Sequence, residues 1–234
     1  MVGTQQDQLK LLGEGEIISS NLTLWGSNYT FLVKVRDEAS RECHAVYKPR
    51  DGEAPLWDFP TGTLYKRECA AYLLSQLLGW SFIPPTVIRE GPYGIGSLQL
   101  FVDHDPRSNY FTVRETHEEQ LKAFACFDLV ANNTDRKASH CILGEDDKVW
   151  GIDHGLTFHE DLKVRTVIWD FSGQAIPPGF LAGLAALEKE LATPKETLKE
   201  LLNLLEPEEV IALAQRVHWI LAEGIYPGVY RRGG

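Results

Sequence analysis

Two short polar segments of this sequence carry the residue types that phosphoryl transfer needs. They span residues 132–137 and 151–155, and each holds one aspartate, Asp135 or Asp153, beside an apolar stretch. One carboxylate can orient an attacking hydroxyl while another holds Mg²⁺ on the phosphates of ATP. The two segments therefore predict a site for phosphoryl transfer.

The chain between the two aspartates predicts how they meet. Residues 140–143 and 148–152 have the pattern of two short strands, and the acidic turn 144–147 joins them. A hairpin of this length brings its outer ends together. We therefore expect Asp135, His140 and Asp153 to converge on one site.

A second pair of charges lies in the first third of the chain. Lys48 ends a strand-like segment, where it can point into a cleft and neutralise phosphate. Glu68 lies 20 residues later (68 − 48 = 20) in a predicted helix, where its carboxylate can pair with Lys48. The alternative is that both residues are ordinary surface charges, since lysine is seldom buried without a partner.

The loop of residues 25–30 is a candidate phosphate-covering segment. Its small and polar residues, Ser27 and Asn28 among them, let backbone N–H groups approach a phosphate closely. An ordinary hairpin turn has the same composition, and this alternative stays open.

The elements that position these residues predict an α+β fold with two lobes. Strands are expected at 15–24, 29–36, 43–48, 86–89 and 97–102, with one helix at 63–78. Helices are expected at 116–130, 179–191, 194–204 and 207–223. The polar segment 103–108 separates the two patterns, which predicts a β-rich N-terminal lobe (1–103) and a mainly helical C-terminal lobe (104–234).

Composition narrows the classes of partner and the compartment. The chain of 234 residues carries a net charge of −10, which argues against broad binding of nucleic acid or anionic lipid. Its four cysteines show no CxxC spacing and lie mostly in apolar runs, as buried free thiols of a reducing compartment do. There is neither an N-terminal export signal nor an apolar run of about 18 residues. We therefore expect a cytoplasmic protein without stable membrane association.

Taken together, these residues resemble a known family. Lys48, Glu68, the Asn-Thr-Asp-Arg stretch ending at Arg136 and the Ile-Asp-His-Gly stretch ending at Gly155 are similar to those of the phosphatidylinositol 3-/4-kinase-related branch of the protein-kinase-like superfamily. Small atypical kinases of bacteria are the group most alike, and the likeness covers roughly residues 26–173. It implies a bilobal protein-kinase-like fold, ATP, and Mg²⁺ or Mn²⁺ as the metal.

The resemblance also implies a role for each matching residue. Lys48 would contact the α/β-phosphates and Glu68 would hold it. Asp135 would orient the acceptor hydroxyl, and Arg136 would steady that loop or the transferring phosphate. Asp153 would bind the metal ion that bridges the phosphates.

Two further positions follow from the resemblance, and one departs from it. Phe101 and Val102, at the end of the last predicted strand of the first lobe, would form the hinge against the adenine ring. His140 stands five residues after Asp135, where kinases usually carry a metal-binding asparagine. An imidazole can bind a divalent cation, but Mg²⁺ prefers oxygen. A Mn²⁺ site, a single-metal site, a weak kinase and a structural histidine are all open.

Three other functions compete for the same residues. A metal hydrolase would use a cluster of histidines and acids (His140, Asp153, His154, His159 and Asp161), although HExxH spacing is absent and strand neighbours face opposite sides. A nucleotide-binding pseudokinase would keep the nucleotide site and act through a partner surface. An AMP-transferase would bind the nucleotide in the reverse direction.

The acceptor is predicted only as a class. Few basic residues follow Asp153 to hold an inositol phosphate headgroup, Lys163 and Arg165 being the nearest. A protein side chain or a small cytosolic molecule therefore ranks ahead of a phosphoinositide as the acceptor.

Overall fold

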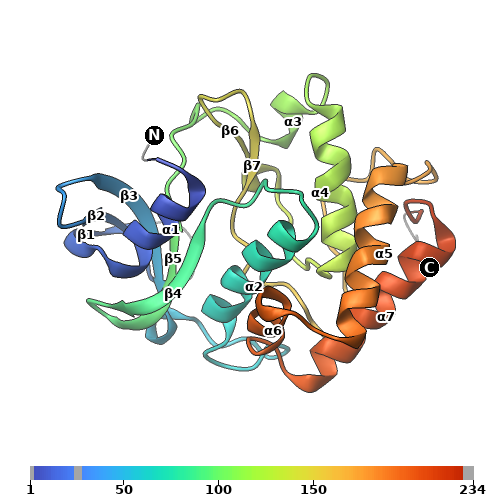
Figure 1. Ribbon diagram of the computed structural model, residues 1–234. Coiled ribbons are helices and arrows are strands. Elements are labelled where there is room, and N and C mark those ends of the chain that lie inside the picture. Colours follow the sequence, from blue (N-terminus) through green and yellow to red (C-terminus); the bar gives the residue numbers. More distant parts are fainter. Residues whose placement is uncertain (1–2, 24–27, 229–234) are drawn as a thin grey trace.

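The computed structural model describes residues 3–23 and 28–228. Within these ranges, an antiparallel five-stranded sheet in the order β1-β2-β3-β5-β4 dominates the first hundred residues (Figure 1). Its strands are β1 (Glu16–Thr23), β2 (Thr30–Arg36), β3 (Glu42–Pro49), β4 (Thr86–Gly91) and β5 (Gly94–Leu100). Lys48 pairs with Ser97 across β3 and β5. The lysine is thus held in the interior of the sheet and not on an edge strand.

A helix that the sequence analysis does not predict packs on this sheet. Helix α1 (Gln5–Glu14) begins with a capping box between Thr4 and Asp7, and its Leu11 and Leu12 join the small core of the sheet. Arg89 of β4 donates to the carbonyls of Leu12 and Gly15 at 2.9 and 2.7 Å and so satisfies the end of the helix. The helix escaped prediction because its sequence is mostly polar.

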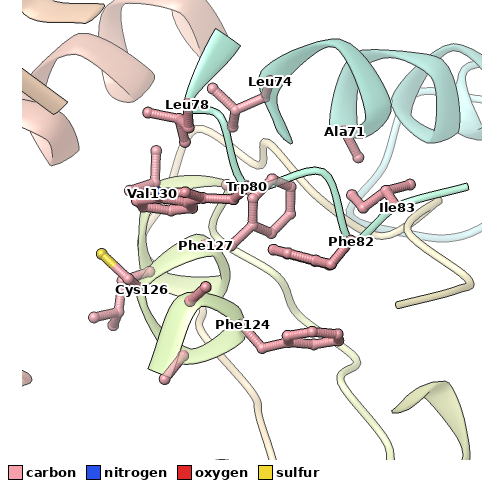
Figure 2. Close-up of a cluster of buried hydrophobic side chains, with 14 of the residues drawn as sticks. Ala71, Leu74, Leu78, Trp80, Phe82, Ile83, Phe124, Cys126, Phe127 and Val130 are labelled. Carbon is pink, nitrogen blue, oxygen red and sulfur yellow. The ribbon is translucent and has the colours of Figure 1, made fainter. Parts of the chain in front are cut away.

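Helix α2 (Leu64–Leu77) lies between the sheet and the helical part of the chain (Figure 1). It is buried on nearly all sides, which agrees with its small residues Ala70, Ala71 and Ser75. Ala71 and Leu74 pack in the larger hydrophobic core with Phe127 of helix α4 (Glu118–Val130) (Figure 2). The element that carries Glu68 is therefore anchored in the core of the helical part.

The remaining elements follow the predicted order. Strands β6 (Cys141–Leu143) and β7 (Val149–Gly151) form the predicted hairpin, in which Cys141 pairs with Gly151. The helices α3 (Tyr110–Val113), α5 (Pro178–Ala192), α6 (Glu196–Leu202) and α7 (Pro207–Glu223) and the short 3₁₀ helices η1 (Arg50–Gly52) and η2 (Ala138–His140) complete the described chain. In Figure 1, α4, α5 and α7 lie together on the side away from the sheet.

The predicted fold class is confirmed: the fold is α+β, with an antiparallel sheet in the N-terminal part and helices in the C-terminal part. All four cysteines are free, and Cys69, Cys126 and Cys141 are buried, as expected. No helix among the described residues has the length and apolar content that a membrane span requires.

Candidate active site

Three charged side chains from distant parts of the chain meet in one network. The ammonium group of Lys48 forms an ion pair with Glu68 of α2 and a second one with Asp153 Oδ1 at 2.8 Å. The other oxygen of Glu68, Oε2, accepts from the backbone N–H of His154 at 2.9 Å. The Lys48–Glu68 pair expected from the sequence is present, and the same carboxylate also holds the segment that carries Asp153.

Charge determines the protonation of this network. Burial lowers the pKa of Lys48, but the charges of Asp153 and Glu68 outweigh it, so that this pKa lies above its ordinary value. The charge of Lys48 holds the pKa of Asp153 well below its usual range, against the effect of burial. Both groups are therefore charged at neutral pH, as binding of a metal–phosphate complex requires.

The backbone around the network has special geometry in two places. Asp153 has a φ of 62°, a left-handed conformation that a non-glycine residue rarely adopts. On the sheet, a Cβ atom at Gly96 would collide with the carbonyl oxygen of Lys48. Glycine at position 96 thus allows the close strand approach that aims the lysine.

His140 lies beside Asp153, with its Nε2 3.3 Å from Asp153 Oδ2. Burial lowers the pKa of His140, against the opposing charges of Asp153 and Asp135. The structure thus brings His140 and Asp153 together, while the convergence of Asp135 with them remains a prediction.

His140 has contacts at both ring nitrogens. The backbone N–H of Lys137 donates to His140 Nδ1 at 3.4 Å. The other nitrogen, Nε2, is the one that lies beside Asp153 Oδ2. The metal-binding role expected for His140 remains a prediction.

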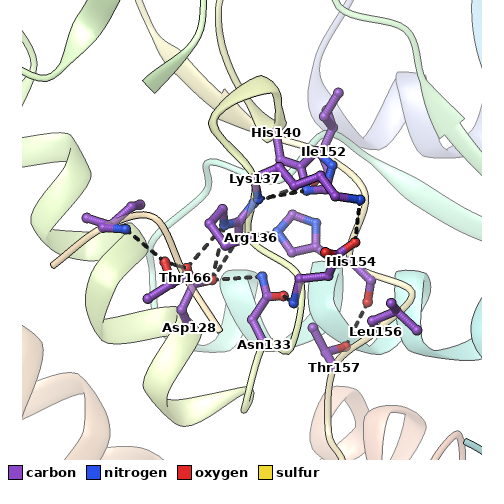
Figure 3. Close-up of polar contacts among 12 residues, drawn as sticks. Asp128, Asn133, Arg136, Lys137, His140, Ile152, His154, Leu156, Thr157 and Thr166 are labelled. Atoms are coloured by element: carbon purple, nitrogen blue, oxygen red, sulfur yellow. Dashed lines mark hydrogen bonds and ion pairs between the residues drawn. The ribbon is translucent and has the colours of Figure 1, made fainter. Parts of the chain in front are cut away.

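Arg136 is the centre of a buried network at the base of the loop of residues 132–137 (Figure 3). Its guanidinium group donates to both oxygens of Asp128 at 2.9–3.2 Å, and both side chains have 0% exposure. Asp128 also accepts from Asn133 at 2.9 Å and from Thr166 at 2.8 Å. The structure corrects one of the two roles expected for Arg136: a side chain buried in this way steadies the loop and does not reach a transferring phosphate.

The same arginine contacts the segment after Asp153 through His154. Arg136 Nη2 donates to His154 Nε2 at 2.7 Å. Burial and the charge of Arg136 lower the pKa of His154 well below its ordinary value, so the ring is neutral. The loop of residues 132–137 and the segment after Asp153 are thus joined by a buried hydrogen bond.

Asp135 faces an open groove. Asn133 Oδ1 accepts from its backbone N–H at 3.0 Å, and Lys137 pairs with its Oδ2 at 2.7 Å. The side chain is 30% exposed. A groove of about 530 Å³ begins at this carboxylate, and the residues lining it are Asp135, Arg136, Lys137, Val164, Arg165, Thr166, Val167 and Trp169.

The remaining predicted residues lie at the edges of this site or outside the described chain. Ser27 falls outside the described residues. Asn28 Oδ1 accepts from the backbone N–H of Ala54 at 2.7 Å, which links two loops of the sheet. Phe101 and Val102 directly follow β5, and the Val102 carbonyl contacts His104 Nδ1 at 2.7 Å. Their phosphate and hinge roles remain predictions.

The histidine and acid cluster of the hydrolase interpretation does not assemble. His159 Nε2 contacts Lys163 Nζ at 2.7 Å, and its Nδ1 accepts from the backbone N–H of Asp161 at 2.9 Å. Across residues 3–23 and 28–228, no three His, Cys, Asp or Glu side chains gather in a group that could hold a metal ion. The described chain lacks the preassembled ligand set of such a hydrolase.

Sequence reasoning missed the residues that hold the loop in place. Asp128 is the main one, and its signal was visible: an aspartate inside the apolar helix residues 123–130 must be paired if that helix is buried. Asn133 had a weaker signal, since asparagine before a loop aspartate often forms a local turn. Thr166 carried none, because its partner lies 38 residues away.

Comparison with known proteins bears on this geometry. A model of the family "Phosphatidylinositol 3- and 4-kinase" matches residues 86–224. Protein Rv2133c of Mycobacterium tuberculosis is 36% identical over 259 residues, covering 96% of this chain and 92% of that protein. Phosphatidylinositol 4-kinase gamma 4 of Oryza sativa subsp. japonica is 28% identical over 189 residues, covering 65% of this chain and 33% of the plant protein.

A solved structure shares the fold. The crystal structure of the Golgi casein kinase with Mn/ADP bound aligns with a TM-score of 0.59, covering 98% of this chain and 77% of that one. The sequence identity is 17%, so this likeness concerns the fold.

Proposed function

This chain belongs to the phosphatidylinositol 3- and 4-kinase family, and on that premise we propose that it is an ATP- and metal-dependent phosphotransferase. The γ-phosphoryl group of ATP would pass to a hydroxyl of a protein side chain or of a small molecule. The observation that carries the proposal is the network of Lys48, Glu68 and Asp153, in which residues from the sheet, from α2 and from the loop after β7 meet. We also propose a division into two lobes near residue 103.

The donor set at Asp153 fits a hard divalent cation. Its carboxylate is 51% exposed, and its two oxygens face Lys48 and His140, so a cation would take the place of one donor. Mg²⁺ and Mn²⁺ are commonly held by one or two carboxylates together with substrate phosphates. The metal would bridge the phosphates and neutralise their charge. Lys48 would then contact the phosphates, with Glu68 fixing its direction.

The proposed acceptor site is the groove at Asp135. Its carboxylate would orient the acceptor hydroxyl and accept its proton, while Asn133 keeps the loop in position. A volume of about 530 Å³ lies in the range of small-molecule sites. Within the groove Lys137 is paired with Asp135, and Arg165 adds a positive charge to the lining.

We place this reaction in the cytoplasm. Four free thiols support a reducing compartment, and the acidic chain supports an acceptor other than a membrane phosphoinositide.

The test is thermal unfolding with ATP, GTP or AMP, each with Mg²⁺, Mn²⁺ or EDTA. A bound nucleotide stabilises the folded state by mass action, by about 2.7 kcal/mol at one hundred times the Kd. We expect a metal-dependent shift with ATP that Asp153→Asn abolishes. Glu188→Gln on α5 is the matched control, because it removes one negative charge from an exposed ion pair with His218. Absence of a shift with every nucleotide and metal would refute the proposal.

A further inference from the structure

The turn of residues 154–157 follows Asp153 directly and sets its direction. Thr157 Oγ1 donates to the His154 carbonyl at 2.8 Å and closes the turn. Two left-handed residues bracket it, Asp153 with a φ of 62° and Phe158 with a φ of 63°. Such backbone persists only where surrounding contacts over-determine it. The question is which contacts do so here.

Two adjacent residues of α2 hold the two ends of this turn. Glu68 Oε2 accepts from the N–H of His154 at 2.9 Å, at the front of the turn. Arg67 Nη1 donates to the carbonyl of Thr157 at 2.7 Å, at the back. Helix α2 thus contacts both ends of this turn, through Glu68 as acceptor and Arg67 as donor. The turn lies directly behind the proposed metal-binding aspartate.

The other arm of Arg67 reaches the far end of the chain. Its Nη2 forms an ion pair with Glu209 in the first turn of α7, and its guanidinium lies 4.9 Å from the ring of Phe59. Arg67 is 1% exposed and Glu209 is 6% exposed. Glu209 Oε2 also accepts from the N–H of Glu206, which completes the cap of α7.

We propose that Arg67 is a positioning residue for the metal site, and that helix α7 acts on that site through it. Glu209 holds the guanidinium group in the orientation in which it donates to Thr157, and the turn then keeps Asp153 aimed at Lys48. The link to metal and nucleotide rests on the function proposed above. The effect on the turn itself does not.

A buried ion pair can instead contribute only to packing, and the two roles have different consequences. Removing one partner of a buried pair is strongly destabilising, whereas replacing both by apolar residues is often neutral. The double variant Arg67→Met/Glu209→Met therefore separates the roles. It restores packing, but no donor to the Thr157 carbonyl remains.

The experiment compares the wild type, Arg67→Met, Glu209→Met and the double variant in the full chain. It measures the midpoint of thermal unfolding, amide hydrogen exchange of peptides covering 153–158 without ligand, and affinity for ATP with Mn²⁺. We expect lower midpoints in the single variants and recovery in the double variant. In the double variant, hydrogen exchange at the turn stays about tenfold faster than in the wild type, and the affinity for ATP with Mn²⁺ stays about tenfold weaker. This is the size of loss typical when the support of a metal ligand is removed.

If the double variant is stable and its hydrogen exchange at the turn and its affinity for ATP equal those of the wild type, the proposal is overturned. If the double variant does not fold, Arg67→Lys decides, because one ammonium group keeps the charge beside Glu209 but lacks the second nitrogen with which the guanidinium fork donates to the Thr157 carbonyl. Faster exchange at the turn in that variant supports the inference, and unchanged exchange overturns it. If the wild type shows no metal-dependent affinity, the proposed function fails, and hydrogen exchange alone decides the positioning role.

Discussion

Two charge networks of this molecule both contact His154 and differ in how completely they are enclosed. Asp128 and Arg136 form one network, in which both side chains have 0% exposure. Lys48, Glu68 and Asp153 form the other, with side-chain exposures of 24%, 4% and 51%. Exposure rises along the second network toward Asp153, where the proposed metal binds.

This difference separates residues that hold the loop in place from residues that would bind a ligand. In the enclosed network every described partner is protein, since Asp128 accepts from Arg136, Asn133 and Thr166. In the open network Glu68 is satisfied in the same way, but Asp153 faces solvent on one side. A ligand can add to the second network without breaking the first. Residue types alone do not make this distinction, since both networks join basic residues to carboxylates.

The largest effect expected is on stability, from the same substitution in each network. Asp128→Asn leaves a buried arginine without its counter-charge, which costs about 3–5 kcal/mol of unfolding free energy. Asp153→Asn removes a carboxylate that is 51% exposed and leaves Lys48 paired with Glu68, so it costs less than Asp128→Asn. Urea unfolding without ligand measures both. Equal losses in the two variants would remove the distinction between the networks.

The next effect is on transfer and not on stability. Asp135→Asn keeps the shape of the side chain but removes the carboxylate that would accept the proton of the acceptor. We expect phosphoryl transfer to fall by about 100-fold or more. Nucleotide binding and unfolding free energy should stay at wild-type values, because the side chain contacts only Lys137 and its own loop. Transfer at the wild-type rate would show that Asp135 is not catalytic.

A smaller effect concerns the metal. His140→Asn replaces a ring nitrogen that lies 3.3 Å from Asp153 with a side chain that can offer an oxygen to a hard cation. We expect the concentration of Mg²⁺ needed for half-maximal nucleotide stabilisation to fall by about tenfold, the size of change reported for support around metal sites. The readout is the thermal shift with ATP at increasing Mg²⁺, with Mn²⁺ in parallel. Unchanged metal dependence would assign His140 a purely structural role.

The smallest expected effect concerns Glu53, a carboxylate that belongs to neither network. Burial raises the pKa of Glu53, although its Oε1 accepts from the N–H of Tyr65 at 2.8 Å. The folded state then holds this proton more tightly than the unfolded state. The resulting stability is present below about pH 4.3, the unfolded pKa, and is lost as pH rises through the folded value. Between pH 4 and 7, the unfolding free energy of Glu53→Gln should rise relative to that of the wild type, by less than about 1 kcal/mol.

The sequence predicted the elements with periodic or bounded apolar patterns. The hairpin of β6 and β7 was visible from its two apolar runs and acidic turn, and α7 was predicted with the bounds it has. The pairing of Lys48 with Glu68 was also predictable, because a lysine on an inner strand needs a carboxylate from the next helix.

What the sequence did not yield depends on contacts between distant residues. Nothing local distinguishes Arg67 from its neighbour Lys66, yet Arg67 is buried against Glu209, 142 residues away. The family resemblance assigned Arg136 a possible contact with phosphate. Its burial depends on Asp128 and Phe124 of α4, which periodicity does not place beside the loop.

The divided carboxylate of Glu68 has a consequence for the order of ligand binding. One oxygen holds Lys48, which would meet the phosphates, and the other holds the N–H after Asp153, which would meet the metal. If Lys48 shifts toward a phosphate, the Glu68 carboxylate is affected, and with it the hydrogen bond from the N–H of His154 that holds the proposed metal-binding segment. Such a coupling free energy is reciprocal: the factor by which nucleotide tightens metal equals the factor by which metal tightens nucleotide. On this assignment the affinity for nucleotide depends on bound metal, and the affinity for metal depends on bound nucleotide. An affinity measured for either ligand alone therefore does not describe the site when both are bound.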